Sequence, residues 1–308
     1  MASNDPPAHL SRLNEALSIP GAVCVEMGRG GLPRIAITGP LAEAEIYLHG
    51  GYVTHFQPRG QDPVLFLSGK SHFDAAKAIR GGIPVIFPWF GPKTGDPAAA
   101  QHGFARTQAW EPVRSRQEPD GTLIIGLRLR SGPDTRGHFP CDFELVYTIR
   151  VGTALGLALE VRNTSTTPFT FEEALHTYLR VADVRKIEIE GLAGRSFIDK
   201  VDGMKRKTQD PGAIRITGET DRVYLDTPGT IVVTDPGMNR RICVQKQGSA
   251  STVLWNPWVD KARAMSDFGD DEWPGMVCVE TANAAENAIT LAAGASHVMQ
   301  ARIAAHLG

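Results

Sequence analysis

The chain has 308 residues, 42% of them hydrophobic and 21% charged, a composition that excludes wholesale disorder. Lysine and arginine together number 32 against 34 aspartates and glutamates, so the net charge of −2 lacks the basic excess typical of nucleic-acid binding. An anionic ligand would therefore be held by individual arginines. No run approaches the roughly 18 apolar residues of a membrane span, and Asn4, Asp5 and Glu15 lie where a signal peptide would be apolar. We expect a cytoplasmic protein whose partners include neither a nucleic acid nor a membrane.

Helical patterning is confined to two short stretches. In the first twenty residues, which we treat as an N-terminal extension, Leu10, Leu13 and Leu17 recur at helical spacing, and a second candidate helix covers Trp258 to Met265. Elsewhere, short alternating apolar runs are separated by turns drawn from 32 glycines and 21 prolines, which is typical of strands. The predicted strands cover residues 22–27, 34–38, 44–48, 52–57, 123–129, 143–151, 155–163, 169–181, 230–235, 241–246, 252–255, 276–280 and 296–304.

This pattern predicts an all-β protein. So few helices cannot cover a parallel sheet, and the strands are therefore expected to pair mostly antiparallel. So many strands avoid long bare edges only in two stacked sheets or a closed barrel. No composition break, low-complexity linker or internal repeat divides the chain.

The four cysteines, Cys24, Cys141, Cys243 and Cys278, are too far apart to form a Cys-x-x-Cys unit. We expect them to be buried free thiols.

Residues 169–181 form the most informative predicted strand. Its odd positions are mostly apolar, and a period of two then places His176 on the polar face with Glu172 and Tyr178. Such neighbours could tune an imidazole for proton transfer near neutral pH, although a solvated surface histidine would give the same pattern. Glu173 and His176 also have the spacing of di-iron ligands, but no helix or second copy supports this interpretation, and we expect no metal.

A second candidate acid or base follows the apolar run 276–279. Glu280 ends this run, where removal from water would raise the pKa of its carboxyl group toward that of a useful base. A capping or ion-paired glutamate is the alternative. Asp221 could accept hydrogen bonds from sugar hydroxyls, and Trp255 and Trp258 flank a proline as sugar-stacking residues do, although core tryptophans look the same.

Two arginines border an aromatic, glycine-containing pair of loops. Arg80 and two glycines precede the stiff apolar segment 83–90, and Gln101 and His102 precede Arg106. Guanidinium groups fit phosphate oxygens bidentately, and glycines let a ligand approach the backbone, so an anionic sugar or nucleotide would suit these loops. Arginines that only tie loops together would give the same sequence.

Taken together, five segments resemble one family in their order and spacing over roughly residues 20–305. They are Ile79–Pro84, Gln101–Arg106, Leu175–Tyr178, Thr220–Tyr224 and Val279–Glu280. The chain resembles the D-hexose-6-phosphate mutarotases, the glucose-6-phosphate 1-epimerase branch of the aldose 1-epimerase family. The segments at 79–84 and 101–106 are fairly specific to this phosphosugar branch.

The resemblance implies one galactose-mutarotase-like β-supersandwich over residues 21–308, interconversion of the anomers of hexose 6-phosphates, and no metal or diffusible cofactor. It assigns His176 and Glu280 as the catalytic residues. It also assigns ligand contacts to Arg80, Gln101, Arg106 and Asp221, and His102 to the pocket lining. A monomer is expected. An epimerase for unphosphorylated aldoses and a noncatalytic carbohydrate-binding or regulatory domain remain the alternatives.

Overall fold

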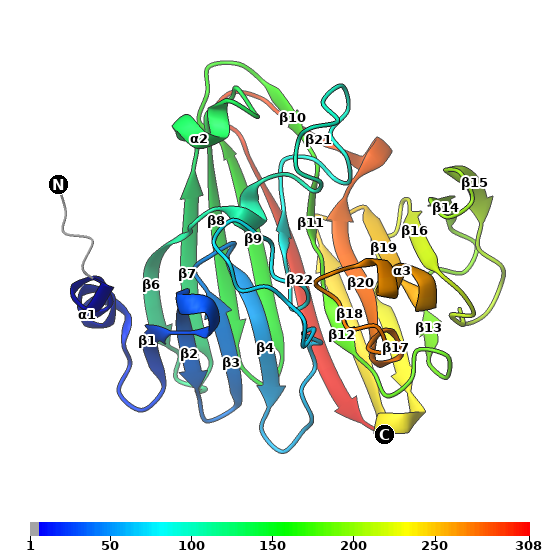
Figure 1. The fold of residues 1–308 in the computed structure, drawn as a ribbon, viewed down its shortest axis with the longest axis horizontal. Coiled ribbons are helices and arrows are strands. Elements are labelled where there is room, and N and C mark those ends of the chain that lie inside the picture. The colour runs from blue at the N-terminus through cyan, green and yellow to red at the C-terminus, as the bar shows by residue number, and fades with distance from the viewer. Residues whose placement is uncertain (1–5) are drawn as a thin grey trace.

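The protein is described here by a computed structural model that covers residues 6–308 (Figure 1). Its regular structure consists mainly of strands that pair antiparallel, as the sequence predicts. The helices of the described part are α1 (Pro6–Leu17), α2 (Pro133–Arg136) and α3 (Trp258–Ala264). Short 3-10 turns are η1 (Arg29–Gly31), η2 (Ala105–Thr107), η3 (Pro236–Met238), η4 (Trp273–Gly275) and η5 (Ala285–Asn287).

Three sheets and one two-stranded ribbon make up the fold. The first sheet has the order β1 (Val23–Met27), β2 (Pro33–Thr38), β3 (Ala42–Tyr47), β4 (Tyr52–Pro58). The long sheet has the order β13 (Glu188–Glu190), β17 (Ile231–Asp235), β18 (Arg240–Gln247), β22 (Ser296–Leu307), β9 (Leu155–Asn163), β8 (Phe143–Val151), β7 (Leu123–Arg130), β6 (Glu111–Gln117).

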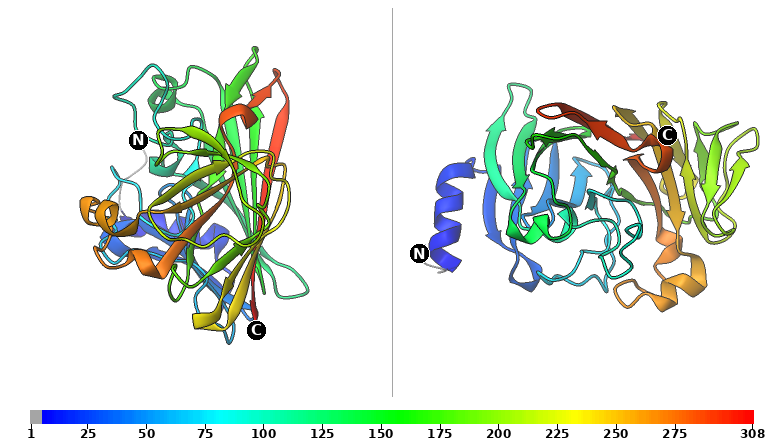
Figure 2. Two further views of the ribbon diagram at one scale, coloured as in Figure 1. Left: turned by 90° about the vertical axis from the view of Figure 1, so that its right-hand side faces the viewer. Right: turned by 90° about the horizontal axis from the view of Figure 1, so that it is seen from above.

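The third sheet is called the front sheet below. Its strand order is β15 (Lys205–Thr208), β14 (Ser196–Asp199), β16 (Thr220–Tyr224), β19 (Ser251–Asn256), β20 (Met276–Asn283), β11 (Glu173–Leu175), β5 (Val85–Ile86). A further strand, β12 (Tyr178–Arg180), also pairs with β20. The ribbon joins β10 (Phe169–Phe171) and β21 (Ile289–Leu291). The long sheet backs the molecule, and the first sheet and the front sheet lie over its two halves (Figures 1 and 2).

The core lies between these layers because the strands alternate. Along β8 and β9, buried positions alternate with half-buried or exposed ones, so one face of each strand enters the core. One apolar cluster runs through the layers, from Val25 of the first sheet to Leu145 of the long sheet and Val279 of the front sheet.

The predicted N-terminal helix is confirmed as α1. It packs beside β1, which is an edge strand. Asn14 satisfies backbone groups of that edge, because its Nδ2 donates to the Val25 carbonyl at 2.6 Å and its Oδ1 accepts from the Val25 amide at 2.8 Å. The helix thus covers an edge that would otherwise present unpaired backbone groups.

None of the helices in the described part is long and apolar enough to cross a membrane.

The predicted strand 169–181 is wrong as one continuous element. It is divided into β10, β11 and β12, and His176 and Thr177 lie in the second break, where the Thr177 amide donates to the Leu175 carbonyl at 2.8 Å. The pairing register with β20 is nevertheless the same on both sides of this break, because Leu175 is opposite Thr281 and Tyr178 is opposite Cys278. Position 176 therefore faces position 280 across the pair.

The expectation of buried cysteines is correct only for Cys278. All four are free thiols, but Cys24 is exposed and Cys141 and Cys243 are half-buried. Cys24 and Cys243 occupy the outward positions of β1 and β18, so strand alternation turns their side chains away from the core.

The sequence does not predict strands such as β6 and β15, because they are polar and largely exposed and therefore lack an apolar alternation.

One half-buried lysine of the long sheet yields a stability prediction. Lys246 lies on β18, and its Nζ donates to the Ser251 carbonyl and the Thr252 hydroxyl, each at 2.7 Å. Burial lowers the pKa of Lys246 to about 7. Because its unfolded pKa is higher, the unfolded state binds more protons above neutrality, and stability rises with pH until the unfolded lysine also deprotonates.

The variant Lys246→Met lacks this pH-dependent contribution of Lys246 to the free energy of unfolding. Between pH 7 and 9 we expect its free energy of unfolding, measured by urea denaturation, to rise less steeply than that of the wild type, by up to about 1.4 kcal/mol per pH unit. Lys186→Met, which removes an exposed lysine, is the control and should keep the wild-type slope. Parallel slopes for Lys246→Met and the wild type would contradict the prediction.

Candidate active site

The imidazole of His176 and the carboxyl group of Glu280 meet on one face of the front sheet. Nε2 of His176 lies 3.3 Å from Oε1 of Glu280, and the side chains are 9% and 1% exposed. Their remaining polar atoms, His176 Nδ1 and Glu280 Oε2, have no hydrogen-bond partner among the described residues. The shared register of β11, β12 and β20 produces this meeting, since it places the two residues directly opposite each other.

The same face carries further residues of the site. One row of paired residues crosses four neighbouring strands of the front sheet. It consists of Asp221 on β16, Trp255 on β19, Cys278 on β20 and Tyr178 on β12, each opposite the next. Residues of one such row point to one face of a sheet, and residues two positions along share that face. Asp221, Trp255 and Tyr178 therefore project on the same side as His176 and Glu280. The prediction that His176 and Tyr178 share a face is correct although the strand is broken.

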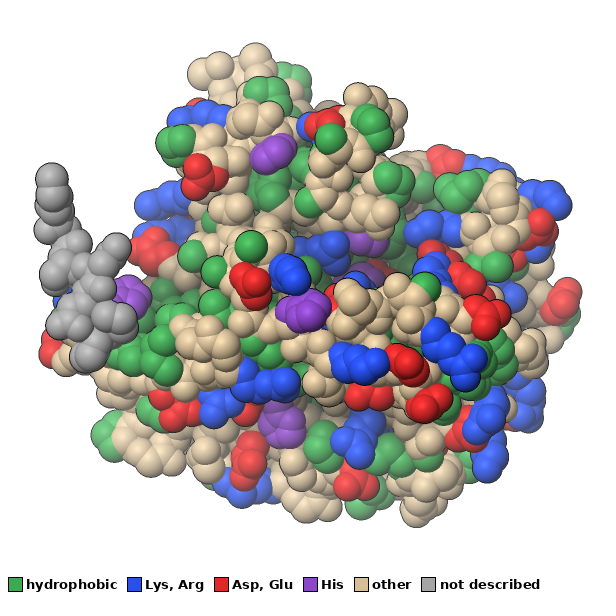
Figure 3. Space-filling model, in the orientation of Figure 1, with side chains coloured by type: hydrophobic (Ala, Val, Ile, Leu, Met, Phe, Trp, Pro, Cys, Tyr) green, Lys and Arg blue, Asp and Glu red, His purple; other side chains and the backbone are tan. Residues whose placement is uncertain are grey.

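These side chains line a cavity of about 250 Å³. The face drawn in Figure 3 is hollowed beside α3, and histidine, lysine and arginine side chains gather there. All seven residues that the resemblance assigns to the site line the cavity: Arg80, Gln101, His102, Arg106, His176, Asp221 and Glu280. Of the two candidate sugar-stacking tryptophans, Trp255 lines it and Trp258 does not. Its other lining residues are Phe90, Tyr178, Lys200, Trp255, Lys261 and Met265.

Two loops bring the arginines to the cavity. Arg80 precedes a segment that pairs with β4, where the Ile83 amide donates to the Val53 carbonyl at 2.9 Å. Gly82 has a φ of +62°, and a Cβ there would collide with the Val53 carbonyl oxygen. Arg106 lies in η2, which follows Gly103. Gly103 has a φ of +69° and passes so close to the Phe87 carbonyl that a side chain could not fit.

The two arginines differ in their partners. Arg80 donates through Nε to Asp267 Oδ2 at 3.1 Å and through Nη1 to the Tyr178 hydroxyl at 3.1 Å. Arg106 donates through Nη2 to the Gln101 carbonyl at 2.7 Å, and no carboxylate of the described residues forms an ion pair with it. Removal from water, with the charge of Arg80 adding to it, lowers the pKa of Arg106. Arg106 therefore carries the uncompensated positive charge of the cavity.

Burial moves the pKa values of the central pair in opposite directions. It lowers the pKa of His176 well below its usual value, and the charges of Arg106 and Arg80 lower it further. It raises the pKa of Glu280 well above its usual value, and the neighbouring Asp221 carboxylate adds to this effect, while Lys200 and Arg106 oppose it. A proton shared by the pair is thereby favoured on the carboxyl group.

Aromatic rings fix the orientation of the imidazole. The His176 ring stacks on Tyr178, with centroids 4.8 Å apart and planes 11° apart. The His102 ring meets it edge-on at 5.8 Å. His102 also accepts the Gly91 amide through Nδ1 at 3.2 Å, so it is held by its own loop. Burial and the nearby arginine charges lower the pKa of His102 as well.

Two lysines were missed by the sequence analysis. Lys200 follows β14 directly and lies 3.1 Å from Asp221, and Lys261 on α3 lies 2.8 Å from Glu219 at the mouth of the cavity. Neither stands in a pattern that would single it out, because a lysine beside a turn or on a short helix is ordinarily solvated. Only the pairing of β14 with β16 brings Lys200 to the site.

Glu173 lies outside the site. Its position on β11 alternates with His176, so it faces the core, where its Oε1 accepts from Asn283 at 2.9 Å and lies 3.2 Å from His297 Nε2. The Glu-x-x-His spacing therefore does not join two groups at one place. Within residues 6–308, no group of three or more His, Cys, Asp or Glu side chains is arranged to hold a metal ion.

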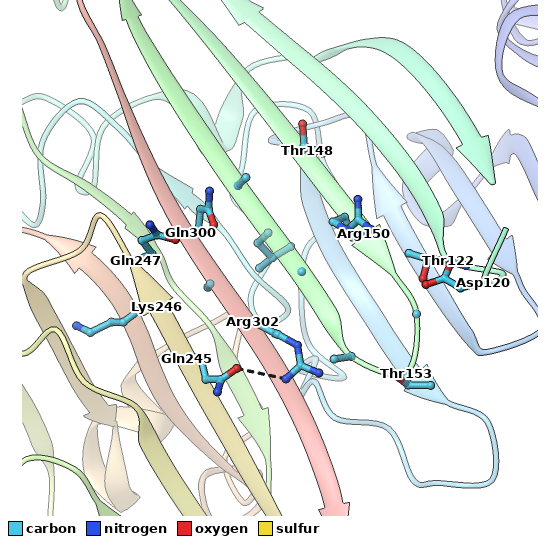
Figure 4. A pocket seen from close by; sticks show the side chains of 16 residues that line it. Asp120, Thr122, Thr148, Arg150, Thr153, Gln245, Lys246, Gln247, Gln300 and Arg302 are labelled. Carbon is cyan, nitrogen blue, oxygen red and sulfur yellow. Dashed lines mark hydrogen bonds between the residues drawn. The ribbon is translucent and has the colours of Figure 1, made fainter. Parts of the chain in front are cut away.

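A larger cavity of about 570 Å³ lies on the outer face of the long sheet (Figure 4). Its lining includes Arg150, Gln245, Gln300 and Arg302, and Gln245 and Arg302 hydrogen-bond each other. Neither histidine nor glutamate lines it, so it lacks the paired acid and base of the first cavity.

The aldose 1-epimerase family model matches residues 33–304, and the chain belongs to this family. It is an isomerase that interconverts the anomers of a sugar.

Individual proteins similar to this chain give a more specific comparison than the family model. The chain is 38% identical over 273 residues to a protein from Cenchrus ciliaris with the provisional name glucose-6-phosphate 1-epimerase, covering 86% of this chain and 82% of that protein. It is 37% identical to an Escherichia coli (strain K12) protein with the same provisional name, covering 83% and 84%. A crystal structure of a provisionally named mutarotase from Salmonella typhimurium superposes with a TM-score of 0.88 at 28% identity, covering 97% and 100%.

Proposed function

We propose that the protein interconverts the α and β anomers of D-glucose 6-phosphate and related hexose 6-phosphates. The observation that carries this proposal is one cavity that holds a buried acid–base pair 3.3 Å apart together with Arg106, a guanidinium without a carboxylate partner among the described residues. The pair suits proton transfer to and from a sugar ring, and the arginine suits a phosphate. The names of the curated relatives support the same substrate.

The chemistry requires two proton transfers. Opening the hemiacetal removes a proton from the O1 hydroxyl and adds one to the ring oxygen O5. In our mechanism Glu280, as carboxylate, takes the O1 proton, and His176, as imidazolium, donates to O5. The C1–C2 bond of the open aldehyde rotates, and the two residues exchange roles as the ring closes on the other face. Nothing is oxidised and no group is transferred, so the reaction needs no diffusible cofactor.

The remaining residues hold the sugar. Arg106 binds the 6-phosphate through the donors that the Gln101 carbonyl leaves free, and Arg80, oriented by Asp267 and Tyr178, adds a second contact. Asp221 accepts hydrogen bonds from ring hydroxyls. Gln101 offers an exposed side chain at the rim, and His102 forms part of the wall.

Polarimetry on freshly dissolved α-glucose 6-phosphate, with glucose and galactose as controls, tests the substrate. We expect the protein to accelerate anomerisation of the phosphorylated sugar strongly and of the neutral sugars weakly. Equal acceleration of all three would identify an epimerase for unphosphorylated aldoses. Binding without acceleration would identify a noncatalytic carbohydrate-binding protein.

Removing either catalytic group should abolish most of the activity. We expect His176→Asn and Glu280→Gln each to lower kcat by about 10² to 10⁴, because a placed acid or base is worth roughly that much. Calorimetry should show glucose 6-phosphate binding close to that of the wild type. His306→Asn and Glu190→Gln, at exposed positions, are matched controls. Full activity in either active-site variant would reject the role assigned to that residue.

Phosphate recognition should depend on Arg106. We expect Arg106→Ala to raise KM for glucose 6-phosphate by about tenfold to a hundredfold, since a hydrogen bond to a charged group contributes about 1.5 to 3 kcal/mol. KM for glucose should change far less. Arg302→Ala, on the outer face of the long sheet, controls for the loss of an arginine. An equal rise of KM for both sugars would count against the assignment.

A further inference from the structure

The charges around the catalytic pair are divided between its two members. Burial lowers the pKa of His176, and the charges of Arg106 and Arg80 lower it further, so both arginines disfavour its protonated form. Arg80 is linked to the imidazole through Tyr178, whose hydroxyl accepts from Arg80 and whose ring stacks on His176. Asp221 raises the pKa of Glu280, and Lys200 and then Arg106 lower it. His176 lies between Glu280 on β20 and the strand β5, which follows Arg80 closely in the chain. The arginine end of the cavity is therefore on the side of the imidazole.

These charges favour the wrong protonation state of His176 for the proposed mechanism, unless an anion offsets the positive charge of the arginines. The ring-opening step needs an imidazolium and a carboxylate, whereas burial and the arginines favour a neutral imidazole beside a protonated carboxyl group. Arg80 already has the Asp267 carboxylate as its partner. Arg106 has only a backbone carbonyl, so an anion at Arg106 would change the field at His176 most.

We propose that the phosphate group of the substrate activates the catalytic pair as well as anchoring the sugar. When the dianion pairs with Arg106, it offsets one of the charges that, together with burial, keep a proton off His176. The proton crosses the 3.3 Å contact from Glu280 Oε1 to His176 Nε2, which leaves the imidazolium acid and the carboxylate base that ring opening requires. This inference rests on the function proposed above and adds that phosphate recognition appears in kcat, not only in KM.

The other titratable groups at the imidazole do not replace this effect. Burial raises the pKa of Tyr178, so its hydroxyl stays neutral. His102 accepts a backbone amide through Nδ1, which favours its neutral form. Lys200 is paired with Asp221, so the Arg106 charge remains the one without a carboxylate partner among the described residues that line the cavity.

The test separates the phosphate from the sugar. We would measure anomerisation of neutral glucose by the wild-type protein with and without phosphite, a dianion that can occupy the arginine end alone. We expect phosphite to raise kcat for glucose at pH 7.5 severalfold, because offsetting the charge of Arg106 raises the pKa of His176 and with it the protonated fraction of the imidazole. Arg106→Gln should lose this response, and Arg302→Gln should keep it.

A second measurement does not depend on any variant. The ¹⁵N resonances of the His176 ring, followed against pH, should show a higher apparent pKa with saturating phosphite than without it. An unchanged titration would overturn the inference. So would phosphite that competes with glucose 6-phosphate yet leaves glucose turnover unchanged, or phosphite that neither competes nor activates.

These outcomes are distinct from a failure of the proposed function. If glucose 6-phosphate is turned over with a kcat equal to that extrapolated for glucose, and only KM differs, the function stands and the activation is wrong. If glucose 6-phosphate is not turned over at all, the proposed function itself is wrong.

Discussion

The pairing of β20 with the interrupted strand β11–β12 is the constraint on which the site depends. The register continues across the break, so His176 and Glu280 lie opposite each other on one face of the front sheet. A slip of one residue would turn one of them to the core face, because side chains alternate along a strand. The break leaves the pairing intact and gives the imidazole its place over the cavity rather than within a regular ladder.

The same pairing also anchors the site to the rest of the molecule. On the core face of these strands, Glu173 is directly opposite Asn283, and both contact His297 of the long sheet. A buried carboxyl group is tolerated there because its neighbours donate hydrogen bonds to it. The strands that carry the His176–Glu280 pair are thus joined to the long sheet three residues away from both members of the pair.

The cavity combines groups that would be costly to bury singly. A chain with almost no net charge gathers two arginines and two lysines around one acid–base pair, and it compensates three of these cations with carboxylates. Within residues 6–308, Arg106 is left without such a partner. In our proposal this imbalance serves two purposes, because the charge that attracts the phosphate is also the charge whose offset prepares the imidazole for proton donation.

The sequence by itself determined the all-β class, the antiparallel pairing, the two helices near residues 10 and 260, and seven of the thirteen residues that line the cavity. It did so through strand periodicity, turn residues and short motifs, all of which are local signals or a likeness to a family. Only the tertiary structure decided the break at His176, the outward cysteines, the arrival of Lys200 and the different partners of Arg80 and Arg106. These features depend on which strand pairs with which and in what register, and pairing between segments far apart in the chain leaves no periodic trace in either segment.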